Sequence, residues 1–271
     1  MRLINRKPGR ALSLFLLILP FVAVLLAYSF ASEARRAENA QDKLLPAPSQ
    51  IAATAERLLT TPDKRSKKVL FWQDTSASLR RLAIGVGISA LLGMGFGLVI
   101  GLLPMARAGL AGFVSVVSMV PPLAILPILF ITFGLGEVSK VALIAIGITP
   151  FLIRDLAQRT LEIPTEQMVK AQTLGASTWV IGLRVALPQI MPRLIQSVRL
   201  SLGPAWLFLI ASEAIAAENG LGYRIFLVRR YLAMDVILTY VIWITLLAFV
   251  FDWALKTLSA KLYPWVVDGG L

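Results

Sequence analysis

The chain contains apolar stretches that are too long for the core of a soluble domain. A helix needs about 20 mostly apolar residues to cross the hydrocarbon core of a bilayer. The segment "ALSLFLLILPFVAVLLAYSF" at 11–30 reaches that length without a charge. Only 15% of the 271 residues are charged and 57% are hydrophobic, whereas soluble domains carry about 25% charged residues. These features predict an all-α polytopic membrane protein.

Six apolar segments predict about six transmembrane helices. They are expected at 11–30, 79–103, 108–133, 141–157, 190–217 and 235–258. The predicted organisation comprises a cytoplasmic N-terminus at 1–10, the first span with an external amphipathic segment at 11–77, a core of five spans at 78–262, and a cytoplasmic tail at 263–271.

The orientation is predicted from basic residues, which are enriched on the cytoplasmic side of a membrane. Residues 1–10 carry four of them, although the segment 32–77 is also rich in Lys and Arg. Charge alone leaves the orientation open, and we place the N-terminus inside because the first helix usually dominates. An alternative is a signal peptide cleaved near "SFA" at 29–31, but the apolar run exceeds the usual length of about 7–15 residues.

The segment after the first span contains a short amphipathic helix in "LPAPSQIAATAERLLTT". Ser49, which follows Pro48, is expected to cap this helix. Helical spacing places its apolar residues on one face, namely Ile51, Ala55, Leu58 and Leu59. The run "DKRSKK" at 63–68 is expected to form a loop.

Composition excludes several classes of chemistry. The sequence has no Cys and no His, so it lacks thiol nucleophiles, disulfides, His-ligated metals and His general bases. It has no G-x-x-x-x-G-K-[ST] loop for binding ATP phosphates. We therefore expect no catalytic residue, no metal site and no cofactor in this chain. The net charge of +12 is interpreted as membrane topology and affinity for anionic lipid headgroups, not for nucleic acid.

Glycine recurs every four residues in the second span. Gly93, Gly97 and Gly101 therefore share one helix face. Small residues at this spacing let two helix backbones approach closely in lipid. Because this need for glycine is steric, a packing face is favoured over a ligand site.

The third span contains three prolines in "VPPLAILP" at 120–127. Proline lacks a backbone N–H and clashes with the preceding turn, so a kinked helix is expected here. Broken helices often border a translocation path, although proline is also common in membrane helices generally.

Glu213 is the most unusual residue of the predicted spans and lies in "WLFLIASEAIAAENGLGY" at 206–223. A carboxylate at membrane depth is costly and normally faces a cavity or a partner. Two interpretations remain open, a functional residue or a structural one that pairs with an Arg or with backbone groups. An intramembrane enzyme could use Glu213 as a base, but no nucleophile motif or second carboxylate accompanies it.

The connection between the fourth and fifth spans predicts two short helices outside the bilayer. The first starts near Pro164 with Glu166 in its first turn, where an acid complements the helix dipole. Gly175 permits a tight bend, Ser177 can cap the second helix, and Pro188 suits the start of the next span. Such a projection could dock a soluble partner or lie flat on the membrane, and these alternatives are equally supported.

The stretch "VKAQTLGASTWVIGLRVALP" at 169–188 resembles the EAA signature of ABC importer permeases, E-A-A-x3-G-x9-I-x-L-P. The matching positions are Ala171, Gly175, Val185, Leu187 and Pro188. Val169 replaces the acidic residue of the signature and Lys170 replaces its second alanine. Glu166, one turn earlier, is a candidate for the missing acid.

The resemblance extends over nearly the whole chain. "SLRRLAIGVGISALLGMGFGLVIG", "VPPLAILPILFITFGLGEVSK" and "AAENGLGY" look like the nitrate/sulfonate/taurine/bicarbonate branch of these permeases. The resemblance implies a type I ABC importer permease fold with cytoplasmic coupling helices within 160–188. It also implies coupling residues, which are Glu166, Ala171, Gly175, Leu187 and Pro188.

Family resemblance implies the partners as well. They are a second permease copy, two cytoplasmic ATP-binding subunits that bind ATP and Mg, and a periplasmic or lipoprotein substrate-binding protein. The chain is then expected in the bacterial inner membrane with both termini cytoplasmic. A path near the third and fifth spans gives candidate pathway residues, namely Glu213, Ser212, Trp206, Ser118 and Pro122.

The substrate is left open between two chemical classes. The branch implies a small polar solute such as nitrate, a sulfonate, taurine or bicarbonate. However, "KLLPAPSQ" and "VKAQTLGAS" also look like permeases that accompany urea carboxylase-type enzymes, which implies guanidine or urea. A secondary transporter is the alternative of another class, but it would need internal repeats and a dedicated ion site.

Overall fold

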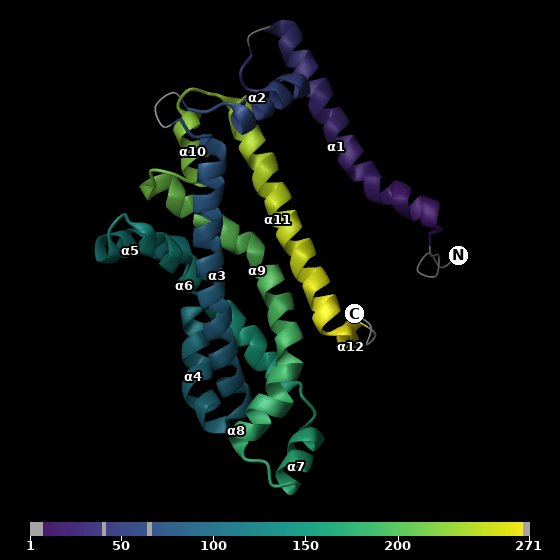
Figure 1. The fold of residues 1–271 in the computed structure, drawn as a ribbon, viewed down its shortest axis with the longest axis vertical. Coiled ribbons are helices and arrows are strands. Elements are labelled where there is room, and N and C mark those ends of the chain that lie inside the picture. Colours follow the sequence, from purple (N-terminus) through teal and green to yellow (C-terminus); the bar gives the residue numbers. More distant parts are fainter. Residues whose placement is uncertain (1–7, 40–41, 64–66, 268–271) are drawn as a thin grey trace. The chain divides into compact units, whose positions relative to one another are not determined.

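The computed structural model describes residues 8–39, 42–63 and 67–267, and these form helices joined by turns (Figure 1). The longer helices are α1 (Arg10–Glu38), α3 (Leu70–Leu102), α6 (Glu137–Leu161), α9 (Leu187–Ala216) and α11 (Met234–Leu262). The shorter ones are α2 (Pro48–Thr60), α4 (Pro104–Val117), the 3₁₀ turn η2 (Pro122–Ile125), α5 (Leu126–Phe133), α7 (Thr165–Thr173), α8 (Thr178–Ile181), the π-helical segment η3 (Gly182–Ala186), α10 (Leu221–Arg229) and α12 (Pro264–Val267). The predicted segments 1–10 and 263–271 and the loop 63–68 lie partly outside the described residues.

The helices confirm the expected all-α membrane architecture. Five of them are long and apolar enough to cross a bilayer, and α4 with η2 and α5 gives a sixth candidate as a bent pair. Most helices extend beyond the predicted spans, and α3 already begins at Leu70 instead of 79. The apolar pattern marks only the part of a helix that hydrocarbon covers, whereas polar turns can continue the same helix into water.

The third predicted span is broken where the sequence predicted a kink. α4 ends at Val117, and the helical path resumes at Pro122 after a bend of 80°. Pro121 and Pro122 account for the break, because each lacks an N–H and each disfavours helical conformation in the residue before it.

Contacts divide the chain into two compact units. One comprises Met1–Thr61 with Val228–Val241, and the other comprises Pro62–Leu227 with Ile242–Leu271. One boundary between the units therefore falls between Thr61 and Pro62, before α3.

In the first unit, side-chain hydrogen bonds connect the helices to turns and to one another. The Tyr28 hydroxyl on α1 donates to the Pro46 carbonyl oxygen in the turn before α2 (2.7 Å). Thr54 on α2 is buried, and its hydroxyl donates to the Asp235 carboxylate at the start of α11 (2.7 Å). These bonds give the amphipathic segment a defined place within this unit.

The start of α2 differs from the prediction. Ala47 occupies the cap position in place of Ser49, and the Gln50 side chain accepts the Ala47 backbone N–H (2.9 Å). Proline is favoured in the first helical turn, where its missing N–H has no partner to lose. Pro48 therefore moves the cap to the residue before it and leaves Ser49 inside the helix.

The core of the second unit is a close contact between α3 and α6, with α9 packed against both. Four glycines of α3 face residues along one side of α6, in the pairs Gly85–Ile144, Gly93–Leu152, Gly97–Leu156 and Gly101–Thr160. Each pair is separated by 59 residues in the sequence, so the two helices run in the same direction with a constant register. A β-carbon built on Gly97 would lie 2.7 Å from the Leu156 β-carbon, which leaves space only for hydrogen.

We expect the substitution Gly97→Leu to destabilise the second unit by about 1–3 kcal/mol, because overpacking forces helices apart. Gly95 is the matched control, since a β-carbon at that position of the same helix meets nothing within 4 Å. The midpoint of thermal unfolding of the purified chain should fall for Gly97→Leu and stay near wild type for Gly95→Leu. Equal midpoints for the two variants would show that the α3–α6 contact does not determine the thermal stability of the chain.

Candidate functional site

Arg81 is a buried arginine of α3 whose five N–H groups all have acceptors. Its side chain is 3% exposed. Nε and Nη2 donate to the two oxygens of Glu137 (both 2.6 Å), and Nη2 also donates to the Asn219 side-chain oxygen (2.6 Å). Nη1 donates to Glu213 Oε1 (2.7 Å) and to the Asn219 carbonyl oxygen (2.9 Å). Arg81 thus connects the start of α6, the end of α9 and the turn before α10.

The Glu213 carboxylate is fully buried and is bound within the chain. Besides Arg81, the Ser78 hydroxyl donates to it (2.8 Å) and the Gly222 backbone N–H donates to Oε2 (2.9 Å). A β-carbon on Gly220 would lie 2.5 Å from its carboxyl carbon, so the turn closes directly over the acid. This geometry favours the structural interpretation of Glu213.

The turn at 220–222 is fixed by side chains from the first turns of α3. The Gly220 N–H donates to Asp74 Oδ1 (2.9 Å) and the Leu221 N–H donates to Ser78 Oγ (2.8 Å). Asp74 also pairs with Arg224 (2.8 Å). Backbone N–H groups at a helix start need such acceptors, so α3 supplies the cap of α10.

Sequence reasoning missed most of this network. The predicted start of the second span at 79 left out Asp74 and Ser78, and Arg81 was not singled out. A signal was present in the spacing, because Asp74, Ser78 and Arg81 follow at i, i+4 and i+7 and so share one helix face.

The connection after α6 contains a helix end that requires glycine. α7 ends at Thr173, and the Ala176 N–H donates to the Ala171 carbonyl (3.0 Å) while the Gly175 N–H donates to that of Gln172 (2.9 Å). These two bonds define a Schellman motif, whose central residue is left-handed. Gly175 has a φ of +83°, so the spacing from Ala171 to Gly175 in the signature is the spacing of this helix end.

The second predicted helix is not a separate element. Ser177 caps α8 as expected, but α8, η3 and α9 form one continuous helix from Thr178 to Ala216. Leu187 and Pro188 therefore lie inside this helix and do not end the connection. Pro188 is tolerated because η3 is π-helical, and a π-bulge changes the backbone pairing beside a proline.

The candidate pathway residues fall into two groups. Ser118 and Pro122 lie at the break between α4 and η2, and Ser118 accepts a hydrogen bond from Arg154 (2.8 Å). Trp206 and Ser212 are buried on α9, where Glu213 also lies. The Trp206 indole N–H has no acceptor within the described residues.

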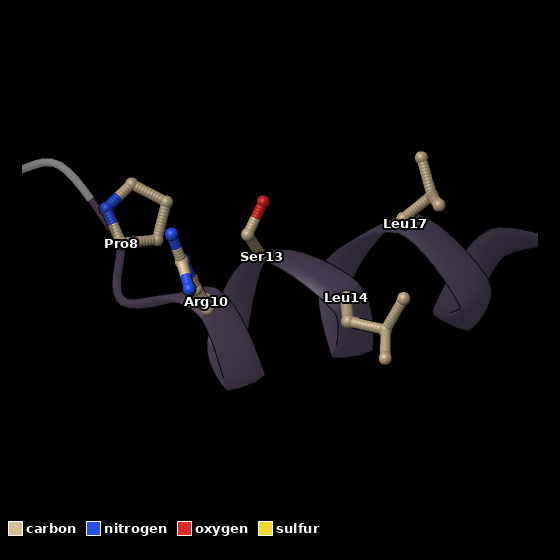
Figure 2. A pocket seen from close by; sticks show the side chains of 5 residues that line it. All are labelled: Pro8, Arg10, Ser13, Leu14 and Leu17. Atoms are coloured by element: carbon tan, nitrogen blue, oxygen red, sulfur yellow. The ribbon is translucent and has the colours of Figure 1, made fainter.

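An open hollow of about 330 Å³ lies beside the start of α1 (Figure 2). Its lining comes from α1 and the residues that lead into it, namely Pro8, Arg10, Ser13, Leu14 and Leu17. Binding sites for small molecules are concave and enclose most of the ligand. A surface formed by one helix cannot do so, and we assign no site there.

The structural interpretation of Glu213 makes a direct prediction. Glu213→Gln should lower the free energy of unfolding by roughly 3 kcal/mol, because it removes one partner of a buried charge. Glu137→Gln is the matched control on the same arginine; Glu137 is 46% exposed, so its loss should cost about 1 kcal/mol or less. Thermal unfolding of the purified variants checks this order. Normal stability with lost uptake in Glu213→Gln would instead identify a substrate contact.

Comparison with known proteins places the chain in a family. The family model of the binding-protein-dependent transport system inner membrane component matches residues 89–263. The taurine transport system permease protein TauC of Escherichia coli (strain K12) is 34% identical over 82% of this chain and 80% of its own length. The putative aliphatic sulfonates transport permease protein SsuC of Bacillus subtilis (strain 168) is 26% identical over 82% of this chain and 78% of its own.

Solved structures show the same fold. A chain of the inward-facing MetNI methionine ABC transporter aligns with a TM-score of 0.64 at 19% identity and covers 71% of this chain and 95% of its own length. The type I importer permease fold is therefore present, with the α7 connection at the position of the EAA signature. The chain belongs to the binding-protein-dependent transport system inner membrane components and is the permease subunit of an ABC importer.

Proposed function

We propose that two copies of this chain form the translocation path of a bacterial inner-membrane importer for a small polar solute. Two cytoplasmic subunits would bind ATP and Mg and drive transport, and the chain itself would carry no cofactor and no enzymatic activity. A substrate-binding protein would deliver the solute from outside. In this arrangement both termini are cytoplasmic, and lipid covers the outer faces of the apolar helices.

The exposed apolar side chains of the α7 connection carry this proposal. Leu174 is 80% exposed, Trp179 74% and Val169 50%. Apolar side chains grouped on a polar surface are typical of a protein interface. The Schellman motif at Gly175 gives this surface a fixed shape, as a docking element requires.

The continuity of α8 with α9 supports a coupling role. A displacement of α7 would act on α8, and α8 is the first turn of the helix that contains Trp206 and Ser212. Closure of the ATP-binding subunits could thus displace a membrane helix, and helix shifts are one of the established ways to switch between two packings. The π-helical segment η3 provides a point at which this helix can bend.

The two departures from the signature lie on the exposed side of α7. Val169 and Lys170 line an open hollow on this helix, together with Thr165, Glu166 and Thr173. The replacements therefore change the chemistry offered to the partner and leave the helix end at Gly175 intact. Glu166 is exposed beside them and is available to a basic residue of the ATP-binding subunit.

Relatives indicate the class of solute. TauC is named for taurine, SsuC for aliphatic sulfonates, and the bicarbonate transport system permease protein CmpB of Synechococcus elongatus is 32% identical over 58% of this chain. All three solutes carry an oxyanion group. Guanidine or urea remains the alternative within the same machinery.

The docking assignment predicts that Leu174→Asp will disrupt association with the ATP-binding subunit, because a charge replaces an apolar interface side chain. Leu135 is a matched control, since it is 63% exposed in the turn at the opposite end of α6. Co-purification of the ATP-binding subunit should fall at least roughly tenfold for Leu174→Asp, about 1.4 kcal/mol, and stay unchanged for Leu135→Asp. Equal recovery of the ATP-binding subunit with both variants would exclude this surface as its docking site.

The importer function predicts that uptake into proteoliposomes will require ATP, the ATP-binding subunit and the substrate-binding protein together. Taurine, methanesulfonate and bicarbonate serve as oxyanion solutes, with urea and guanidinium as the comparison set. Flux that persists without the ATP-binding subunit would identify a secondary transporter instead.

Gly175→Val should abolish ATP-dependent uptake, whereas Gly175→Asn should retain more of it, because Asn tolerates the left-handed conformation.

A further inference from the structure

We propose that Arg154 contacts the transported solute and that its guanidinium, next to Ser118, binds an oxyanion group. This inference rests on the proposed function and names the solute chemistry recognised inside the path. Four observations on the second unit carry it: the depth of Arg154, its lack of an acidic partner, its position at a broken helix, and the commitment of the nearby acids.

The register between α3 and α6 gives the depth of Arg154. With the offset of 59 residues that the glycine pairs establish, Arg154 is level with Gly95. The apolar part of α3 continues for another seven residues to Leu102, which is about 10 Å of helix. Arg154 thus lies within the apolar zone of the bundle. A charge at that depth faces the bundle interior or a water-filled cavity rather than lipid.

Arg154 differs in its partners from Arg159 and Arg199. Arg159 pairs with Asp155 (3.7 Å) and Glu162 (3.3 Å), and Arg199 pairs with Asp252 (2.9 Å). For Arg154, the described residues supply one hydrogen bond, to Ser118 Oγ, and no carboxylate within 4.0 Å. Its side chain is exposed, so most of the guanidinium donors can reach a ligand.

The hydroxyl of Ser118 is oriented for this role. It donates to the Ser115 carbonyl oxygen (2.7 Å), which leaves its lone pairs to accept from Arg154 Nη1 (2.8 Å). Ser118 lies where α4 ends and the chain bends by 80°. Irregular backbone at membrane depth is tolerated only where it is buried in protein or lines a water-filled cavity. The broken helix and Arg154 therefore both indicate a water-filled cavity at this position.

The acids of the second unit favour an anionic solute over guanidinium. Glu213 is enclosed by Arg81 and backbone N–H groups, Asp155 accepts from Ser197 and pairs with Arg159, and Asp252 pairs with Arg199. A cationic solute that used one of these three acids would have to break its pair. An oxyanion needs only the free donors of Arg154, and a guanidinium group matches the planar or tetrahedral oxygens of such anions well.

Cysteine accessibility tests the inference, since the chain has no Cys of its own. Ser118→Cys is prepared in the full chain, co-purified with its ATP-binding subunits in lipid nanodiscs. It is labelled with an anionic or a cationic methanethiosulfonate reagent. We expect the anionic reagent to react roughly tenfold faster than the cationic one, relative to a free thiol, because a positive charge lies within a few ångströms. Methanesulfonate should slow this labelling, whereas urea and guanidinium should not.

Second-site variants separate solute binding from a role in capping α4. Arg154→Gln should abolish both the charge preference and the protection by methanesulfonate, and Arg154→Lys should restore part of each. Arg159→Gln, which removes a paired arginine of the same helix, should leave both unchanged. If Arg154 only caps α4, methanesulfonate will not protect Ser118→Cys even though the charge preference remains, and the inference is overturned.

Further results of the labelling and uptake experiments also test the role of Arg154. Failure of both reagents to label Ser118→Cys would show that the break is closed to water, and protection by urea or guanidinium would assign the opposite solute chemistry. ATP-dependent uptake by the unmodified complex is measured in parallel. Uptake without protection by methanesulfonate would reject the role of Arg154 and leave the importer function standing. Protection without ATP-dependent uptake would reject the importer function alone.

Discussion

The second unit depends on one buried guanidinium. Arg81 uses all five of its N–H groups on Glu137, Glu213 and Asn219. A charge at 3% side-chain exposure is costly to bury unless it is paired and hydrogen-bonded. Because each partner comes from a different element, satisfying the charge also fixes where α6 begins, where α9 ends and how the turn before α10 closes. The buried charge is therefore satisfied only when the helices adopt this one arrangement.

The close packing of α3 on α6 continues the register that Arg81 establishes at one end. Small residues face α6 from Gly85 to Gly101, namely four glycines and the buried Ser89, whose hydroxyl donates to the Ala145 carbonyl oxygen, so the backbones approach closely. Two helices joined in this way move as one body. By contrast, the helix from Thr178 to Ala216 contains a π-helical segment next to the α7 connection. Under the proposed function, the rigid pair is the fixed frame and the continuous helix is the element that the ATP-binding subunits displace.

Sequence alone predicted the features that a single local rule determines. Gly175 was identified from the spacing of the signature, and its φ of +83° shows the reason, a helix end that only a left-handed residue completes. Glu213 was identified because an acid is rare at membrane depth. Arg81 was missed because its role depends on Glu137 and Asn219, 56 and 138 residues away, and no local pattern reports such partners. The angle of the break after α4 could not be predicted from the sequence either, since proline indicates that a helix is interrupted but not in which direction the chain continues.

Charges within the apolar zone fall into two classes, and the difference bears on transport. A group such as Glu213, whose two oxygens both accept hydrogen bonds within the chain, contributes the same interactions in the presence and absence of solute. It therefore cannot discriminate one solute from another. Arg154 keeps most of its donors free beside a broken helix, so a solute that supplies oxygens gains interactions there that water must otherwise provide. Selectivity inside the path then follows from which charge the fold leaves unpaired, and that charge is positive.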